Sequence, residues 1–234
     1  MPDVLDITNL SVSYPDGTVA LSGVTLRVGV GSRVALIGPN GAGKTTLLLA
    51  VMGGVKFSGR ILVDGIELST RTVSEVRSRC GMTFQNPDDQ LFMPTLLEDV
   101  AFGPLNQGCP PAEAEARAKA AIEAAGLAGL ERRSAHHASE GQKRSASLAT
   151  ILSMNVKLLL LDEPGGGLDF RSRRRLTEIL AGRNEAMLMA THDMDTVRAL
   201  CQRVVLLDGG HVEAVGSVEE ILGDGALLAR HGLA

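Results

Sequence analysis

The 234-residue chain has the composition of a globular protein: 44% of its residues are apolar, 21% are charged, and the net charge is −4. The negative net charge provides no positive field to attract nucleic acid. With no Trp, one Tyr and five Phe, the chain also has few aromatic rings on which bases could stack, so we expect no nucleic-acid partner. The longest apolar runs are short and the first ten residues carry acids, so the sequence predicts no membrane span and no signal peptide. Three widely spaced cysteines predict free thiols in reducing surroundings.

The first third of the chain is expected to consist mainly of strands. Alternating apolar residues predict strands over Val4–Tyr14 and Val19–Val30. The continuous apolar run at residues 34–37 predicts a strand that is buried on both faces, and a glycine-rich loop and a helix over Lys44–Met52 follow it. A hairpin is expected over Arg60–Leu68.

The middle of the chain has a different pattern. From about Asn86 to Asn155 the sequence predicts helices and no strand. Prolines at 110 and 111 and a glycine at 126 bound an alanine-rich helix, because proline suits a first helical turn and glycine suits the position after the last. Another helix is expected over Ser139–Leu152.

Short apolar strands return after this region, separated by helical stretches. They are expected at Lys157–Leu161, Met187–Ala190 and Val204–Leu207. Alternation of strand and helix predicts a parallel sheet with helices on its faces, here an α/β core interrupted by a helical insertion. We therefore expect one domain over residues 1–234, whose core comprises 1–85 and 156–234 and whose helical part comprises 86–155.

A phosphate-binding motif follows the strand at residues 34–37. Residues 38–45, Gly-Pro-Asn-Gly-Ala-Gly-Lys-Thr, fit the pattern GxxxxGK[ST]. The glycines let backbone N–H groups approach phosphate oxygens, and the helix that follows points its positive end at the same anion. Lys44 is expected to contact the β- and γ-phosphates of a nucleotide, and the Thr45 hydroxyl is placed to ligate Mg²⁺.

Two acids, Asp162 and Glu163, follow the apolar run Leu158–Leu161 directly. Open α/β sheets bind their ligands at the carboxyl ends of the strands, where these acids are expected to lie. Asp162 suits the Mg²⁺ shell, and Glu163 is placed to accept a proton from an attacking water. The sequence therefore predicts hydrolysis of ATP with Mg²⁺.

With these two elements in place, the chain resembles an ABC-type nucleotide-binding domain over essentially its whole length. The resemblance implies a P-loop NTPase (RecA-like) core with an antiparallel β subdomain and an inserted helical subdomain. It implies that Tyr14 stacks on adenine, that Gln85 reaches the Mg²⁺ and the attacking water, and that His192 contacts the γ-phosphate. It also implies that a second chain completes each site through its signature motif, residues 138–142, and its D-loop, residues 167–169. The remaining nucleotide-contacting residues that it implies are Gly38, Asn40, Gly41, Gly43, Thr46, Ser139, Gly141, Gln142 and Asp169.

Each isolated residue also has a simpler interpretation. Tyr14 could be a half-buried strand residue, Gln85 a turn residue, and His192 a capping or core histidine. His136 and His137 are expected at the surface, and the arginines at 173–175 are expected on a solvated helix face.

The signature departs from the family's usual Leu-Ser-Gly-Gly-Gln. Here it is Ala-Ser-Glu-Gly-Gln at residues 138–142, so Ala138 removes a packing anchor and Glu140 adds a carboxylate. The dipole of the following helix favours Glu140 while nucleotide phosphates repel it, so we expect weaker or slower closure. Gly165 and Phe170 replace the usual Thr or Ser and Pro, and these changes concern loop rigidity more than chemistry.

The segments Phe84–Phe92 and Glu98–Pro104 are similar to the ATPases of energy-coupling-factor importers, within them the cobalt and nickel branch. This resemblance implies a second ATPase chain, identical or a paralogue, and integral membrane subunits as partners. It implies a location on the cytoplasmic face of the membrane and transport of cobalt, nickel or another micronutrient. Two other classes remain open: a soluble ABC ATPase without a transport role, and a nucleotide-dependent interaction module that does not hydrolyse ATP.

Overall fold

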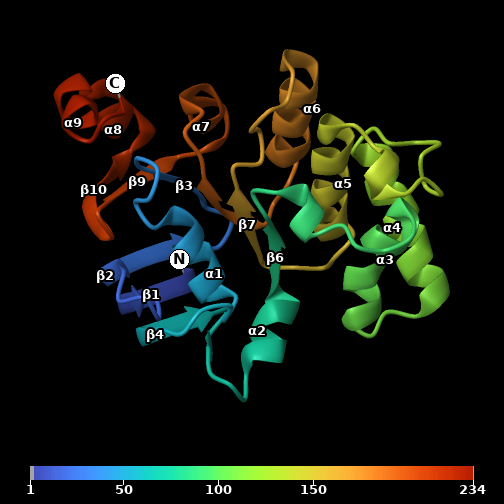
Figure 1. Ribbon diagram of the computed structural model, residues 1–234, viewed down its shortest axis with the longest axis horizontal. Coiled ribbons are helices and arrows are strands. Elements are labelled where there is room, and N and C mark those ends of the chain that lie inside the picture. The colour runs from blue at the N-terminus through green and yellow to red at the C-terminus, as the bar shows by residue number, and fades with distance from the viewer. Residues whose placement is uncertain (1–2, 234) are drawn as a thin grey trace. The chain divides into compact units, whose positions relative to one another are not determined.

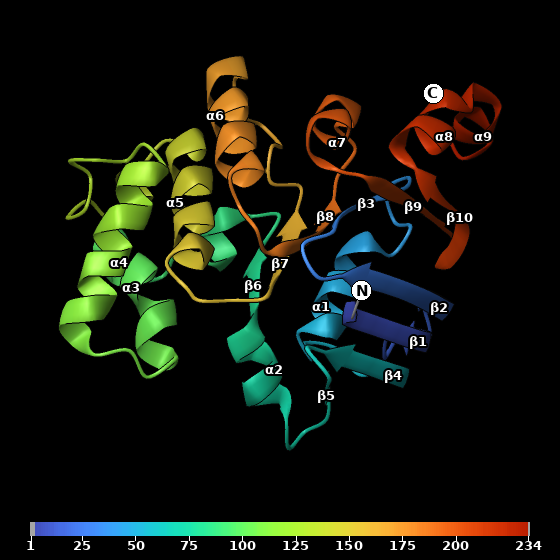
Figure 2. The ribbon, with the colours of Figure 1, turned by 180° about the vertical axis from the view of Figure 1, so that it is seen from behind.

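The computed structural model describes residues 3–233 (Figures 1 and 2). By the density of its internal contacts the chain divides into two compact units. The first contains the described residues of Met1–Cys80, Lys157–Asp162 and Asn184–Ala234, and the second contains Gly81–Val156 and Glu163–Arg183. The sequence had assigned residues 81–85, 156 and 163–183 to the core, whereas their contacts group them with the helical unit.

An antiparallel sheet forms one part of the first unit. Its order is β2 (Val19–Gly29), β1 (Asp3–Ser13), β4 (Ser58–Val63) and β5 (Ile66–Glu67). Along β1 and β2 buried apolar residues alternate with more exposed ones, as a sheet with one covered face requires. The two predicted strands and the predicted hairpin are thus confirmed within one or two residues.

A second sheet carries the parallel strands. Its order is β10 (His211–Ser217), β9 (Arg203–Asp208), β3 (Arg33–Ile37), β8 (Ala186–Ala190), β7 (Leu158–Asp162) and β6 (Cys80–Thr83). Strand β3 pairs in parallel with β8 and β9, and β7 pairs in parallel with β8. Every residue of β7 and β8 is buried, which explains their uninterrupted apolar sequences.

Five helices accompany these sheets in the described part of the first unit. They are α1 (Lys44–Val51), α2 (Val73–Arg79), α7 (Met194–Leu200), α8 (Val218–Gly223) and α9 (Gly225–Arg230). Helix α1 follows β3 through the glycine-rich loop and packs against β2 and β7. Its position fixes the end of that loop beside the parallel sheet.

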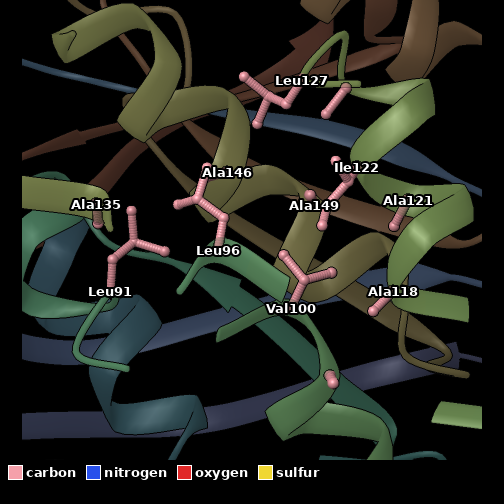
Figure 3. Close-up of a cluster of buried hydrophobic side chains, with 12 residues drawn as sticks. Leu91, Leu96, Val100, Ala118, Ala121, Ile122, Leu127, Ala135, Ala146 and Ala149 are labelled. Atoms are coloured by element: carbon pink, nitrogen blue, oxygen red, sulfur yellow. The ribbon is translucent and has the colours of Figure 1, made fainter. Parts of the chain in front are cut away.

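The second unit is helical. It comprises α3 (Leu96–Asn106), α4 (Pro111–Ala124), α5 (Glu140–Leu152) and α6 (Phe170–Ala181), with short 3₁₀ turns at Pro87–Asp89 and Ala135–His137. Figure 3 shows the side chains of α3, α4 and α5 meeting in one apolar cluster, in which Leu96 and Ile122 are fully buried. Many members of the cluster are alanines, so the helices pack closely. The prediction that residues 86–155 contain helices and no strand is confirmed.

Helix ends in this unit follow the predicted chemistry. Pro111 begins α4, and Gly126, with φ of 78°, lies just beyond its end.

Within residues 3–233, no helix combines the length and apolar character needed to cross a bilayer.

Candidate functional site

Three parallel strands of the first unit bring the predicted motifs to one edge. Ala190, the last residue of β8, pairs with Leu36 near the end of β3 and with Asp162 at the end of β7. The loop at 38–45 follows β3, and Thr191 and His192 follow β8. The N–H of Thr191 donates to the carbonyl of Leu36 at 3.2 Å, which keeps this turn close to the loop.

The glycines of the loop have backbone conformations that other residues rarely adopt. The φ angles of Gly38, Gly41 and Gly43 are 155°, 80° and 102°. A Cβ on Gly38 would lie 2.0 Å from the carbonyl oxygen of Leu207, and one on Gly43 would lie 2.5 Å from that of Ala20. Glycine is therefore required at these two positions by both conformation and space.

The lysine of the motif folds back over the loop. Lys44 is 8% exposed, and its Nζ donates to the carbonyl oxygens of Gly38 at 2.7 Å and Pro39 at 3.0 Å. A buried ammonium group needs such partners, because desolvation disfavours its charge. The loop thus holds a positive charge at its centre, where phosphate oxygens would compete for it.

Two oxygen ligands meet beside this lysine. The Thr45 hydroxyl donates to Oδ2 of Asp162 at 2.8 Å, and the Asp162 side chain is almost wholly buried. A hydroxyl and a carboxylate are hard oxygen donors, the type that Mg²⁺ prefers, and they come from the two segments that the sequence assigned to it. The residues present therefore fit a magnesium ion.

Tyr14 lies beside the start of α1. Its hydroxyl and that of Thr46 are 3.0 Å apart, and its side chain remains 37% exposed. This contact joins the end of β1 to the phosphate-loop helix and leaves part of the ring accessible. His192 is exposed, and the next residue, Asp193, caps α7 by accepting from the N–H groups of Asp195 and Thr196.

In the second unit, Glu163 has an unusual backbone. Its φ of 46° lies in the left-handed region, where a non-glycine residue is uncommon. Its carbonyl oxygen accepts hydrogen bonds from the N–H of Gly166 at 3.0 Å and from Nη1 of Arg144 at 3.4 Å. The same Nη1 donates to the carbonyl oxygen of Gln85 at 3.1 Å, and the Gln85 residue is exposed.

The signature residues form the N-terminus of α5. Ser139 Oγ accepts from the N–H of Gln142, and the Gln142 side chain accepts from the N–H of Ser139, so the pair makes a capping box. Glu140 lies in the first turn, with Oε1 3.4 Å from Nε of Arg144. The predicted surface positions of His136 and His137 are confirmed.

Asp169 caps α6. Its carboxylate accepts from the N–H of Ser172 at 2.8 Å, and this hydrogen bond lowers the pKa of the Asp169 side chain. The helix that follows is 12 residues long and begins with the 83%-exposed Phe170. The cap therefore fixes the turn that joins the predicted D-loop to this helix.

The two units each gather part of the predicted site. The first brings together residues from both ends of the chain, namely Tyr14, Gly38, Asn40, Gly41, Gly43, Lys44, Thr45, Thr46, Asp162 and His192. The second holds Gln85, Ser139, Gly141, Gln142, Glu163 and Asp169.

Two functional candidates in the second unit carry no sequence signal of their own. Arg144 contacts the main chain at Gln85 and Glu163. Gln90 accepts from the N–H of Phe84 at 3.1 Å and donates to Thr150 Oγ1 at 2.6 Å, so it ties the segment around Gln85 to α5. An arginine or a glutamine alone is ordinary on a helix or loop surface, and only the contacts distinguish these two.

Comparison with known proteins identifies the family. The chain matches the ABC transporter family over residues 21–166. The energy-coupling factor transporter ATP-binding protein EcfA of Methanothermobacter thermautotrophicus is 41% identical over 236 residues, which cover 98% of this chain and 76% of that protein. The structure of cbiO1 from Clostridium perfringens, part of the ABC transporter complex cbiONQ, has a TM-score of 0.83 and 32% identity, covering 100% of this chain and 96% of that one. The dimeric bacterial ABC transporter cassette MJ0796 has a TM-score of 0.84 and 25% identity, covering 92% and 98%.

The fold and the phosphate loop define an α/β ATPase that binds ATP or ADP. The chain belongs to the ABC transporter family of ATP-binding domains, and it is the ATPase subunit of a transporter. The predicted resemblance to energy-coupling-factor ATPases and the predicted fold class are both confirmed.

Proposed function

We propose that this chain powers an energy-coupling-factor importer and works on the cytoplasmic face of the membrane. Its relationship to EcfA and to a cbiONQ subunit supports this type of transporter. Cobalt or nickel is the proposed cargo, with another micronutrient as the alternative. The Thr45–Asp162 hydrogen bond carries the ATPase part of the proposal, because it joins the phosphate loop to the last residue of β7, which Glu163 follows.

Within the site, we assign each polar group a separate task. Lys44 neutralises the β- and γ-phosphates, and Thr45, Asp162 and Gln85 hold Mg²⁺. When bound, this ion would offset negative charge on the phosphates. Glu163 accepts the proton of the attacking water, and His192 contacts the γ-phosphate.

We further propose that catalysis requires two chains. The dimeric cassette MJ0796 supports this arrangement, as does the family to which the chain belongs. Ser139, Gly141, Gln142 and Asp169 would then face the nucleotide held by the phosphate loop of the other chain. A two-fold axis would create two equivalent sites.

The segment after Gln85 supports contact with a membrane partner. Phe92 is 62% exposed, and its ring meets that of Phe102 edge to face with centroids 5.1 Å apart. Phe84 and Leu105 of the same unit are also exposed. Exposed apolar groups of this kind are typical of protein contacts, so we assign Phe92 and Phe102 to the surface of this chain that contacts a membrane partner.

Phe92→Ser is expected to weaken retention by the membrane complex about tenfold or more, because an aromatic anchor is lost, while ATP turnover of the purified chain stays unchanged. The measurement is co-purification from membranes after co-expression with the integral membrane subunits of an energy-coupling-factor importer, together with phosphate release. Val215→Ser is the matched control, since Val215 is a 47%-exposed apolar residue of the other unit.

Two outcomes would contradict the proposal. ATP turnover without any co-purifying membrane protein would indicate a soluble ABC ATPase. Nucleotide binding without turnover, alone or in the membrane complex, would indicate an interaction module.

A further inference from the structure

Arg144 connects three functional segments of the helical unit. It lies on α5, one turn after the signature, and its side chain is only 16% exposed. Nη1 donates to the main-chain carbonyls of Gln85 and Glu163, at 3.1 Å and 3.4 Å, and Nε lies 3.4 Å from the carboxylate of Glu140. One guanidinium group thus contacts the Gln85 segment, the proposed general base and the signature.

The turn after Glu163 is shaped to receive this guanidinium group. A Cβ on Gly166 would lie 3.8 Å from Nη1 of Arg144, and one on Gly167 would lie 3.8 Å from Nε, so the arginine rests against the turn. The carbonyl of Glu163 accepts from both Arg144 and Gly166. Both bonds fix the orientation of a residue whose φ of 46° is intrinsically disfavoured.

A guanidinium group suits this task better than an ammonium group. It is planar and always charged, and it can direct donors toward several acceptors in a fixed geometry. Its charge strengthens the hydrogen bonds to the two carbonyls, of which the one to Glu163 is partly shielded from water. The main chain at Gln85 and at Glu163 is therefore held by one rigid group.

We propose that Arg144 is a positioning residue, which sets the main chain of Gln85 and Glu163 from the helix that carries the signature. The proposal rests on the proposed role of Glu163 as general base. Displacement of α5 when the signature meets nucleotide would move the guanidinium group and, with it, both carbonyls. Arg144 thereby links engagement of the signature to alignment of the base.

Glu140 has a second role in this arrangement. Its carboxylate lies 3.4 Å from Nε of Arg144, close enough for charge attraction although Nε makes no hydrogen bond, and so it acts on the same guanidinium group. Repulsion between Glu140 and nucleotide phosphates would make its removal beneficial, whereas its support of Arg144 would make its removal harmful. The pair is a partly exposed i,i+4 contact, so we assign Glu140 a smaller share of the positioning than Arg144.

The test compares kcat and KM for ATP in Arg144→Ala and Arg144→Lys. Alanine removes both hydrogen bonds, and we expect kcat to fall by about tenfold to 100-fold, since small misplacements of catalytic groups have effects of this size. KM should change less than about twofold, because the proposed role of Arg144 is to align groups for the chemical step and not to bind nucleotide. Lysine keeps one charged donor, so the kcat of Arg144→Lys should lie between those of Arg144→Ala and the unmutated chain.

The matched control is Arg175→Ala. Arg175 also donates to a main-chain carbonyl of the helical unit, that of Glu123, at 3.5 Å, but it contacts neither Gln85 nor Glu163. Its kcat should stay within about twofold of the unmutated value. Thermal unfolding of all variants identifies losses of activity that are due to instability. If Arg144→Ala does not fold, the kcat of Arg144→Lys tests the positioning role instead.

Two results would overturn the proposal, and a third would overturn the role of Glu140. Normal kcat in folded Arg144→Lys and Arg144→Ala, with Glu163→Gln inactive, would remove Arg144 from positioning and leave the proposed function intact. Normal turnover in Glu163→Gln would overturn both. For Glu140→Gln we expect kcat to fall about twofold, with no further loss in Glu140→Gln/Arg144→Ala relative to Arg144→Ala. A rise in kcat that disappears at high salt would show that phosphate repulsion outweighs support of Arg144 and would overturn the role of Glu140.

Discussion

Glu163→Gln is expected to bind ATP as tightly as the unmutated chain and to hydrolyse it about 10²- to 10⁴-fold more slowly. The amide has nearly the shape of the carboxylate, so the backbone turn at φ 46° and the hydrogen bond from Arg144 can remain. It cannot accept the proton of the attacking water. Binding and chemistry should therefore separate in this variant.

Equilibrium binding of ATP and the rate of phosphate release measure the two properties. Glu178→Gln provides the control, because Glu178 is an exposed acid of the same unit that pairs with Arg174 at 2.9 Å. It should hydrolyse ATP at the unmutated rate. Fast phosphate release from Glu163→Gln would remove Glu163 from the role of general base.

Lys44→Ala is expected to abolish turnover and to weaken ATP binding roughly 10- to 100-fold, the range that corresponds to one lost charge-assisted hydrogen bond. Nζ of Lys44 lies against the carbonyls of Gly38 and Pro39, inside the loop that would enclose the phosphates. Alanine would leave the negative charge of the bound phosphates without this positive partner. Both binding and the chemical step should suffer, in contrast to Glu163→Gln.

Binding isotherms and phosphate release also test this variant, together with thermal unfolding, because Lys44 contributes to the packing of its own loop. Lys56→Ala is the control, since it removes the same charge from the same unit outside the loop. Unchanged ATP affinity in folded Lys44→Ala would contradict the assignment of the 38–45 loop as the phosphate site.

Much of the fold was predictable because uninterrupted apolar runs in the sequence indicate buried strands. The run Leu158–Leu161 has no polar residue, and its strand is buried at every position. The last strand, His211–Ser217, was not predicted, since its residues are exposed or half-buried and it contains no long apolar run. Its antiparallel pairing with β9 stabilises this strand, although its own sequence does not indicate one.

The candidate site was predictable where a motif fixes the backbone and less so where contacts come from distant segments. Gly38 and Gly43 need conformations that only glycine adopts readily, so the loop could be predicted from the sequence. The Tyr14–Thr46 contact and the Arg144 network depend on how separate segments pack. No spacing rule in the sequence encodes those distances.

The signature illustrates a residue with two roles. The sequence pointed to Ser139 for nucleotide contact, and in the structure Ser139 also caps α5 together with Gln142. Loss of an N-cap of this kind costs about 1 kcal/mol of stability. Any substitution at Ser139 therefore needs a folding control before its effect on turnover is interpreted.

The measurement that most directly tests the central claim, a two-chain ATPase site, mixes two inactive variants. Lys44→Ala damages the phosphate loop and Ser139→Arg blocks the signature, so each variant alone should be inactive. In a mixed dimer both lesions fall in one composite site, and the other site is intact. Random one-to-one mixing makes half of the dimers mixed, each with one good site, so about a quarter of normal ATP turnover should return. No recovery from folded variants, with unmutated turnover per chain independent of concentration, would contradict the two-chain site for a homodimer.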